Sequence, residues 1–325
     1  MELWEISFFQ LFVTALLSKI VTILLCIHIW LRTTVGRFYS TERMDGKTVL
    51  ITGGNSGLGL ATTRDLARRG ARIIMASRKI EVGKNVKEQI IKETGNKNII
   101  FKQLDLSSQK SIREFADDIL KTETKIDVLI HNSGCASTSV KKLSVDGIEM
   151  TMATNHYGPF LLTHLLIDLL KKSQPCRIVI VSSAYYKIAR VDLSNLNPVN
   201  TFPFYLYYVT KTANIMFGLE LAKRLKDTKI SVLIVNPGMC NTAIFKKVPF
   251  PLNLIVKHSF KNAEEGAQTT IMVAVSKKLD GVSGKYFSDC RESKLWSFVK
   301  NEEKNRIFWE ESVKMCKLRP SDPMI

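Results

Sequence analysis

The sequence has little that would indicate a metalloprotein, a disulfide-rich protein or a nucleic-acid-binding protein. None of its six cysteines sits at C-x-x-C spacing, so neither a zinc site nor a disulfide framework is predicted, and reduced thiols are expected. The histidines, aspartates and glutamates show no metal-ligand spacing, so we predict no metal site. The formal net charge is +17, yet the lysines and arginines form no basic stripe of the kind nucleic acid requires. A surface attracted to anionic lipid is the better explanation of this charge.

Internal repeats, low-complexity segments and linkers are also lacking beyond the N-terminus. With 45% hydrophobic and 24% charged residues, the composition is that of an ordinary globular protein, which excludes a disordered chain. A chain of 325 residues can bury a large core. We therefore expect residues 45–325 to form a single domain that includes the C-terminal tail.

The N-terminus carries one long apolar run, residues 6–31. At 1.5 Å per residue it is long enough to cross a hydrocarbon layer about 30 Å thick. Lys19 in its middle opposes insertion by roughly 2.5–3.5 kcal/mol, which the apolar residues outweigh modestly. No small-residue cleavage site follows, so residues 1–44 are predicted to be a retained signal-anchor and linker, with a segment lying in the membrane face as the main alternative. Because the basic residues follow the run, residues 45–325 should face the cytosol.

Beyond Asp45, short β-branched runs alternate with amphipathic helical stretches. The runs are almost continuously apolar, which is typical of parallel strands covered by helices on both faces. This alternation predicts an α/β fold of the Rossmann type, a doubly wound parallel sheet that binds ligands beyond the carboxyl ends of its strands. Strands are expected at residues 47–52, 71–76, 98–104, 126–131, 177–182, 230–236 and 284–288, and helices at residues 57–69, 80–93, 108–121, 156–172, 205–226 and 262–276.

A glycine-rich segment, TGGNSGLG at residues 52–59, lies between the first expected strand and the first expected helix. Its glycines allow a tight turn and a close approach to a pyrophosphate at the helix N-terminus, so dinucleotide binding is predicted. Arg78 and Lys79 end the second strand, where an NAD-dependent enzyme usually carries Asp or Glu for the ribose 2′-hydroxyl. The two cations favour a 2′-phosphate, and hence NADP(H), over the alternative of a solvated surface pair.

Residues 205–211, YLYYVTK, place three tyrosines just before a lysine. On a helix, Tyr207 and Lys211 are i and i+4 and share one face, whereas Tyr208, at i+3 from the lysine, is a geometric rival. Tyr205 points away. A phenol titrates near ~10 and acts as an acid–base at neutral pH only where a nearby cation favours its anion. The pair supplies that arrangement, although a solvated surface contact would show the same spacing.

Taken together, the motifs resemble the short-chain dehydrogenase/reductase family over residues 45–290. The glycine segment matches the family's TGxxxGxG, NSG at 132–134 is similar to its NNAG, and YxxxK spans Tyr207 to Lys211. LDL at 104–106, VSS at 181–183 and NPG at 236–238 resemble further segments of the family. His131, Ser133 and Thr210 depart from the usual residues, and none of them occupies a catalytic position.

The resemblance implies a catalytic tetrad. Tyr207 would be the proton donor and acceptor, Lys211 would bind the nicotinamide ribose and lower the Tyr207 pKa, and Ser183 would orient the substrate oxygen. Asn155 would hold a water that links Lys211 to solvent. The implied cofactor contacts, besides Tyr207 and Lys211, are Thr52, Gly53, Asn55, Ser56, Gly57, Leu58, Gly59, Arg78, Lys79, Asp105, Leu106, Asn132, Ser133, Gly134, Pro237, Gly238 and Thr242.

Finer features resemble the membrane-bound, NADP-preferring retinol dehydrogenases, among them residues 154–166, 211–225 and 284–290. A substrate lid is expected at residues 239–262, with Cys240 and Phe245 contacting substrate alongside Ser183 and Tyr207. The expected activity is NADP(H)-dependent interconversion of retinol and retinal at the endoplasmic reticulum membrane. Isoprenoid alcohols, fatty aldehydes and ketosteroids are alternative substrates, and a catalytically silent NADP-binding scaffold is a rival from another class. Many relatives form homodimers, and the sequence leaves such pairing open.

Overall fold

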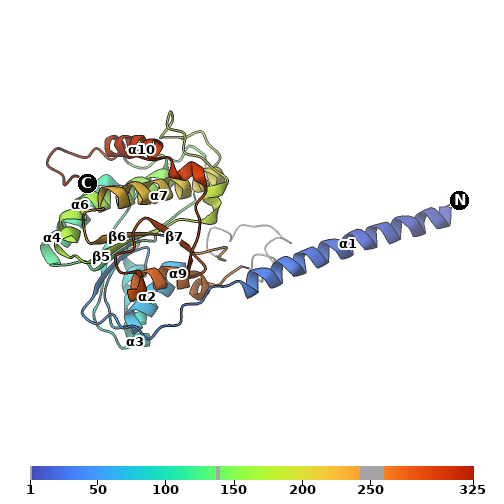
Figure 1. Ribbon diagram of the computed structural model, residues 1–325, viewed down its shortest axis with the longest axis horizontal. Helices are drawn as coiled ribbons and strands as arrows, with labels where there is room; N and C mark the ends of the chain where they lie inside the picture. Colours follow the sequence, from blue (N-terminus) through green and yellow to red (C-terminus); the bar gives the residue numbers. More distant parts are fainter. Residues whose placement is uncertain (1, 137–139, 242–259) are drawn as a thin grey trace.

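A computed structural model describes residues 2–136, 140–241 and 260–325 of the chain. In these ranges eight strands form one sheet, in the order β3-β2-β1-β4-β5-β6-β7-β8 (Figure 1). Seven strands run parallel and β8 pairs antiparallel with β7. The strands are β1 (Thr48–Thr52), β2 (Arg72–Ser77), β3 (Ile99–Gln103), β4 (Val128–His131), β5 (Cys176–Val181), β6 (Ile230–Asn236), β7 (Lys285–Ser288) and β8 (Arg291–Glu292).

Helices cover both faces of the sheet, which confirms the doubly wound α/β fold predicted from the sequence (Figure 1). On one face lie α2 (Gly57–Arg68), α3 (Ile80–Thr94) and α9 (Ala263–Val275), and on the other α4 (Gln109–Thr122), α6 (Gly158–Lys172) and α7 (Pro203–Arg224). Outside α7 packs α10 (Glu302–Met315), which the sequence reasoning missed. Shorter elements are α5 (Met150–Met152), the π-helix η1 (Ala153–Tyr157) and the 3-10 helices η2 (Ala184–Lys187), η4 (Lys277–Leu279) and η5 (Ser297–Lys300).

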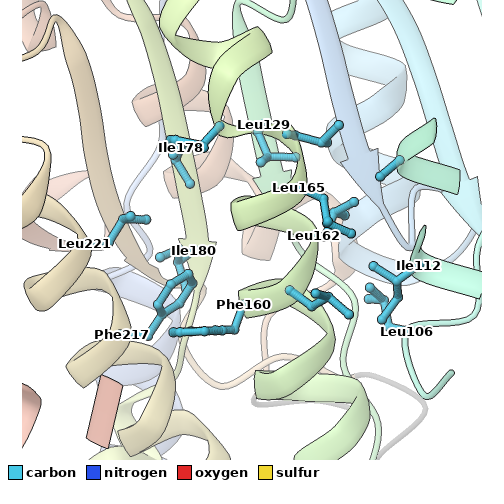
Figure 2. Packing of buried hydrophobic residues seen from close by; sticks show 14 of the residues in the cluster. Leu106, Ile112, Leu129, Phe160, Leu162, Leu165, Ile178, Ile180, Phe217 and Leu221 are labelled. Atoms are coloured by element: carbon cyan, nitrogen blue, oxygen red, sulfur yellow. The ribbon is translucent and has the colours of Figure 1, made fainter. Parts of the chain in front are cut away.

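The strand residues alternate between two apolar cores. Leu50, Ile74 and Leu129 point to the α6 side, whereas Val49 and Ile51 point to the α9 side. Figure 2 shows the first core, in which Phe160 and Leu165 of α6 and Phe217 and Leu221 of α7 pack against Ile178 and Ile180 of β5. Each fully buried Leu, Ile or Phe contributes roughly 1.5–3 kcal/mol, so this packing fixes where α6 and α7 lie.

The direction of chain winding reverses between β1 and β4, because β1 pairs with β2 on one side and with β4 on the other. A crevice for ligands is expected beyond the carboxyl ends of the strands at such a switch point. The glycine segment follows β1 and the NSG segment follows β4, so the two motifs meet at this crevice. The fold thereby brings together residues that are some 80 positions apart in sequence, such as Thr52 and Asn132.

Helix α1 (Glu2–Thr33) projects away from the α/β body (Figure 1). Many of its apolar side chains are exposed, including Phe8 at 70% and Phe12 at 60%. Within the described parts of the chain, no helix combines the length and apolar character needed to cross a membrane, so the spanning anchor expected at residues 6–31 is not supported. The base of α1 is tied to α9, because Arg32 donates two hydrogen bonds, of 2.8 and 2.9 Å, to the Glu265 carboxylate.

Candidate active site

Tyr207 and Lys211 lie on the first turns of α7, a helix that begins at Pro203, as proline's fixed φ favours. The Lys211 Nζ lies 5.3 Å from the centroid of the Tyr207 ring. Lys211 is 3% exposed, and its Nζ donates a 3.1 Å hydrogen bond to the Val181 carbonyl at the end of β5. The i,i+4 pair predicted from sequence therefore consists of a buried lysine and a half-buried tyrosine at the carboxyl edge of the sheet.

Burial shifts the pKa of both groups toward the neutral form. It lowers the pKa of the Lys211 ammonium to about 8, and it raises the pKa of the Tyr207 phenol well above its ordinary value. The nearby Tyr185 and Cys240 side chains raise the Tyr207 pKa further. Burial is the main cause of the Tyr207 shift, and the lowering of the Tyr207 pKa by Lys211 stays a prediction. Tyr207 is a protonated phenol at neutral pH, which suits proton donation.

The neighbouring tyrosines differ in environment from Tyr207. The Tyr208 ring stacks on Tyr185, with ring centroids 4.8 Å apart and an interplanar angle of 28°. Tyr205 is 41% exposed. Among the ring contacts described, Lys211 lies over Tyr207 and over neither of the other two. This geometry agrees with the choice of Tyr207 from the spacing.

The two serines after β5 have separate partners. The Ser182 hydroxyl donates a 2.7 Å hydrogen bond to the Lys211 carbonyl, which links the strand end to α7. Ser183 is the N-cap residue of η2, and its hydroxyl accepts a 3.3 Å hydrogen bond from the Tyr185 N–H. Ser183 thus keeps a hydroxyl hydrogen for another acceptor. Of the two, Ser183 is the one that remains available to a substrate oxygen.

Asn155 lies in the π-helix η1, a rare element that recurs at functional sites. Its side chain is buried and fully bonded: Oδ1 accepts from the Cys135 N–H at 2.8 Å, and Nδ2 donates to the Cys135 carbonyl at 2.8 Å and to the Thr210 hydroxyl at 3.1 Å. Thr210 in turn donates to the Tyr207 carbonyl at 2.7 Å. Sequence reasoning treated Thr210 only as a departure from the family serine, yet it joins Asn155 to α7.

The glycine segment has the shape of an anion cradle. Gly53 and Gly57 adopt φ of +68° and +52°, a region that favours glycine. A Cβ on Gly59 would lie 2.1 Å from the Gly53 carbonyl oxygen and 2.5 Å from Asn132 Nδ2, so no side chain fits there. In the described structure the Ser56 side chain makes no capping hydrogen bond to α2, although it is the N-cap residue. Backbone N–H groups at this helix terminus therefore face the crevice, next to Asn55 and Leu58.

Residues after β4 fix this cradle from the other side. The Thr52 hydroxyl accepts hydrogen bonds of 3.1 Å from the N–H groups of Asn132 and Ser133. Asn132 Nδ2 donates to the Thr52 carbonyl at 3.1 Å. A Cβ on Gly134 would lie 3.7 Å from Lys211 Nζ, which places the NSG segment beside the lysine. The structure thus brings the glycine loop and the Tyr–Lys pair to one crevice.

The residues expected at the adenine end occupy the neighbouring strand ends. Arg78 and Lys79 follow β2 and are exposed. Asp105 follows β3, and its Oδ1 accepts hydrogen bonds from the N–H and the hydroxyl of Ser107 at 2.9 and 2.7 Å. The Leu106 side chain is instead 5% exposed and belongs to the α6-side core (Figure 2), so only its backbone can contribute to a cofactor site.

The NPG turn after β6 lies on the opposite side of the crevice. Gly238 has a φ of +84° and donates to Asn236 Oδ1 at 3.0 Å, and the same oxygen accepts from the N–H of Ala184, next to Ser183. Cys240 is buried, and its thiol donates to the Pro237 carbonyl at 3.4 Å. Burial raises the Cys240 pKa to about 12, so it stays a thiol. Thr242 and Phe245, and most of the expected lid, lie outside the described residues.

Two observations show that these residues fit a dinucleotide. The glycine loop leaves no room for a side chain at Gly59, and the Ser56 side chain does not cap the N-terminus of α2 in the described structure. The crevice also contains a buried lysine beside a phenol. The end of β5, just before Ser183, is joined to α7 by the hydrogen bond from Ser182 to the Lys211 carbonyl. Such a set of groups can bind a dinucleotide and transfer a proton to or from an oxygen.

Comparisons with known proteins agree with this geometry. A family model described as short chain dehydrogenase matches residues 47–250. Retinol dehydrogenase 14 of Mus musculus is 40% identical over 284 residues, covering 82% of this chain and 85% of the mouse protein. Retinol dehydrogenase 11 of Homo sapiens is 39% identical over 276 residues, covering 84% and 86%.

Solved structures show the same fold. A crystal structure of an uncharacterized protein from Mycobacterium paratuberculosis matches with a TM-score of 0.69 and 30% identity, over 86% of this chain and 96% of that chain. The RhlG/NADP active-site complex of Pseudomonas aeruginosa matches with a TM-score of 0.63 and 21% identity, over 77% and 97%. The chain therefore belongs to the short-chain dehydrogenase family and is an oxidoreductase that adopts a nicotinamide-dinucleotide-binding fold.

Proposed function

We propose that this enzyme interconverts a lipophilic alcohol and its aldehyde or ketone with NADP(H), and that retinol and retinal are its substrate pair. The observation that carries the proposal is the protonated Tyr207 phenol beside the buried Lys211, next to the glycine cradle. Relatives of about 40% identity that bear the name retinol dehydrogenase support the choice of substrate.

In this proposal the dinucleotide, when bound, would supply the hydride for reduction as NADPH and accept it in oxidation as NADP+. Tyr207 donates a proton to the carbonyl oxygen during reduction and accepts it during oxidation. Ser183 directs its free hydroxyl hydrogen to the same oxygen and so stabilises the developing alkoxide. Lys211 binds the ribose beside the nicotinamide, and its positive charge favours the Tyr207 anion that proton donation leaves behind.

Asn155 acts on the reaction through Thr210 and the Cys135 backbone. Its amide joins the loop after β4 to the first turns of α7, so it fixes the distance between the cradle and the Tyr207–Lys211 pair. The family resemblance adds a water that links Lys211 to solvent. Residues 45–325 act as one catalytic domain in this scheme, with residues 239–262 as its substrate lid.

The NADP(H) preference rests on Arg78 and Lys79. Both side chains are exposed at the end of β2, where a 2′-phosphate would be bound, and no acidic residue occupies either position. We expect Arg78→Asp to shift the ratio of kcat/KM for NADPH over NADH by at least about tenfold toward NADH, because a fully formed charge-assisted hydrogen bond contributes about 1.5–3 kcal/mol. Steady-state kinetics with both coenzymes measure this ratio. An unchanged ratio would assign the ribose contact to another residue, and Lys84→Asp on α3 is the matched control.

We further propose that α1 attaches the enzyme to a membrane surface from the cytosolic side, at the endoplasmic reticulum. The exposed apolar side chains of α1 and the net charge of +17 support this arrangement. A substrate dissolved in lipid would then reach the crevice without crossing bulk water.

The decisive experiment for the activity is NADPH oxidation with all-trans-retinal by the detergent-solubilised protein, beside Tyr207→Phe and Tyr208→Phe. We expect activity to fall by about two or more orders of magnitude in Tyr207→Phe and by less than about threefold in Tyr208→Phe. Equal losses in the two variants would remove Tyr207 from its proposed role. If the wild-type protein binds NADPH but does not reduce retinal, the substrate is to be sought among isoprenoid aldehydes, fatty aldehydes and ketosteroids.

A further inference from the structure

The connection between β7 and β8 has an unusual backbone. Asp289 and Cys290 join the two antiparallel strands, and both have positive φ, of 50° and 57°. A two-residue connection of this kind is typical of Asn-Gly or Asp-Gly, because left-handed backbone costs roughly 1–2 kcal/mol at other residues. Strained residues persist where their surroundings fix them, and they cluster at functional sites.

Three separate elements fix this turn. Lys261 Nζ donates a 2.5 Å hydrogen bond to Asp289 Oδ1, and the lysine side chain is only 9% exposed. The Cys290 N–H donates to the Thr269 hydroxyl of α9 at 3.2 Å. On the remaining side Gly36 lies so close that a Cβ would come within 2.2 Å of the Asp289 carbonyl carbon.

Lys261 extends from this turn to the NPG turn of the crevice. Its Nζ donates a second hydrogen bond, of 3.2 Å, to the Pro237 carbonyl, and a Cβ on Gly238 would lie 2.7 Å from the same Nζ. Its backbone adds a bridge, in which the Lys261 N–H donates to the Met239 carbonyl and the Lys261 carbonyl accepts from Asn241. Lys261 therefore makes three hydrogen bonds to the stretch from Pro237 to Asn241.

A parallel path leaves the same turn toward Ser183. Ser288, the last residue of β7, accepts a 3.0 Å hydrogen bond from Asn236 Nδ2. Asn236 Oδ1 accepts from the N–H groups of Gly238 and Ala184. The end of β7 is thus joined both to the NPG turn and to the residue that follows Ser183.

From these contacts we propose that Lys261 and Asp289 are a positioning pair that sets the Pro237–Gly238 turn for the nicotinamide end of the dinucleotide. The inference rests on the proposed function, which places nicotinamide beside this turn. Lys261 reaches no reacting atom: it acts through the Pro237 carbonyl, and Asp289 keeps the ammonium pointed at that carbonyl. An apolar side chain at position 261 would leave the Pro237 carbonyl without this buried donor.

The test compares binding of two ligands to the full-length protein, NADP+ and 2′-phospho-ADP-ribose, which lacks only the nicotinamide. We expect Lys261→Met to raise the Kd of NADP+ about tenfold, which corresponds to about 1.4 kcal/mol, and to change the Kd of 2′-phospho-ADP-ribose by less than twofold. Asp289→Asn should show the same selective loss to a smaller degree. The double variant should lose no more affinity for NADP+ than Lys261→Met does, because the two residues act as a unit.

Lys285→Met is the matched control, since Lys285 forms an exposed ion pair with Glu292 on the same two strands, at 2.9 Å. Asp289→Asn guards against misfolding, because asparagine tolerates left-handed backbone. Equal losses for both ligands, or no loss for either, would overturn the inference. If the wild type prefers NAD+, the same comparison uses NAD+ and ADP-ribose. If Lys261→Met weakens the binding of NADP+ alone and the wild type does not turn over retinal, the positioning role of the pair stands and the proposed substrate is refuted. The two failures are therefore distinguishable.

Discussion

At the scale of single residues, three buried histidines matter more to stability than to catalysis. His131 and His156 donate through Nε2 to Thr163 and Ser312, since each of these hydroxyls donates to a backbone carbonyl in turn. His164 donates through Nδ1 to the Phe160 carbonyl. In the described structure the second ring nitrogen of each has no hydrogen-bond partner. A proton added there would be buried and unpaired.

Burial accordingly lowers the pKa of His131 and His156 to about 3 and that of His164 to about 4. Because the unfolded chain takes up these protons near pH 6.5 and the folded chain does not, folding stability is complete above that pH and falls as the pH drops below it. At pH 5, each of these histidines should lower the free energy of unfolding by about 2 kcal/mol relative to neutral pH. When the pH falls from 7 to 5, we therefore expect the free energy of unfolding of His131→Asn to decrease by about 2 kcal/mol less than that of the wild type. Urea unfolding at both pH values measures this difference, and His28→Asn on α1 is the control. Identical decreases in the free energy of unfolding of His131→Asn and wild type would contradict the prediction.

At the scale of elements, the strands and helices of the sheet were predictable because their apolar patterns are long. All seven parallel strands and the six helices between them lie where the sequence indicated, to within a few residues. Of the elements that the sequence did not predict, three have a clear physical reason. β8 has only two residues, too few to show an apolar alternation. α10 is mostly polar and packs on α7 through few residues. The π-helix around Asn155 accompanies a buried amide whose hydrogen-bond partners are distant in sequence.

Two glycines of the nucleotide loop are required for different reasons, and this difference is testable. Alanine at position 57 would face open space but adopt a φ of +52°, a cost of roughly 1 kcal/mol. Alanine at position 59 would overlap the Gly53 carbonyl and Asn132, at a cost of about 3 kcal/mol. Thermal unfolding without dinucleotide should therefore show Gly59→Ala with the clearly lower Tm. Equal Tm values would mean that the loop can move away from the added methyl group.

At the scale of the whole molecule, the sequence identified the crevice but not the contacts that connect it to the N-terminus. The glycine loop and the NSG, VSS and NPG segments could be placed from motif order alone, because each begins at or just after the end of a strand and these strand ends share one edge. Tyr207, Lys211 and Asn155 lie instead on α7 and η1. The contacts of Arg32 with Glu265 and of Gly36 with Asp289 join positions more than 200 residues apart, and no local pattern encodes them. They place the base of α1 beside α9 and the β7–β8 turn, on the side of the molecule that carries the NPG turn.

Because of this placement, the membrane attachment that we propose for α1 concerns the whole enzyme. Phe8, Phe9 and Phe12 are 60–70% exposed, and each would contribute about 1.5–3 kcal/mol on burial in lipid. We expect the triple change of these residues to serine to reduce co-flotation with phosphatidylcholine–phosphatidylserine vesicles by at least about tenfold, while kcat toward a water-soluble short-chain aldehyde stays within about twofold of wild type. Tyr39→Ser, an exposed aromatic residue outside α1, is the control and should float like the wild type. Undiminished flotation of the triple variant that disappears at high salt would assign attachment to the basic surface instead, because exposed charges are screened and apolar burial is not.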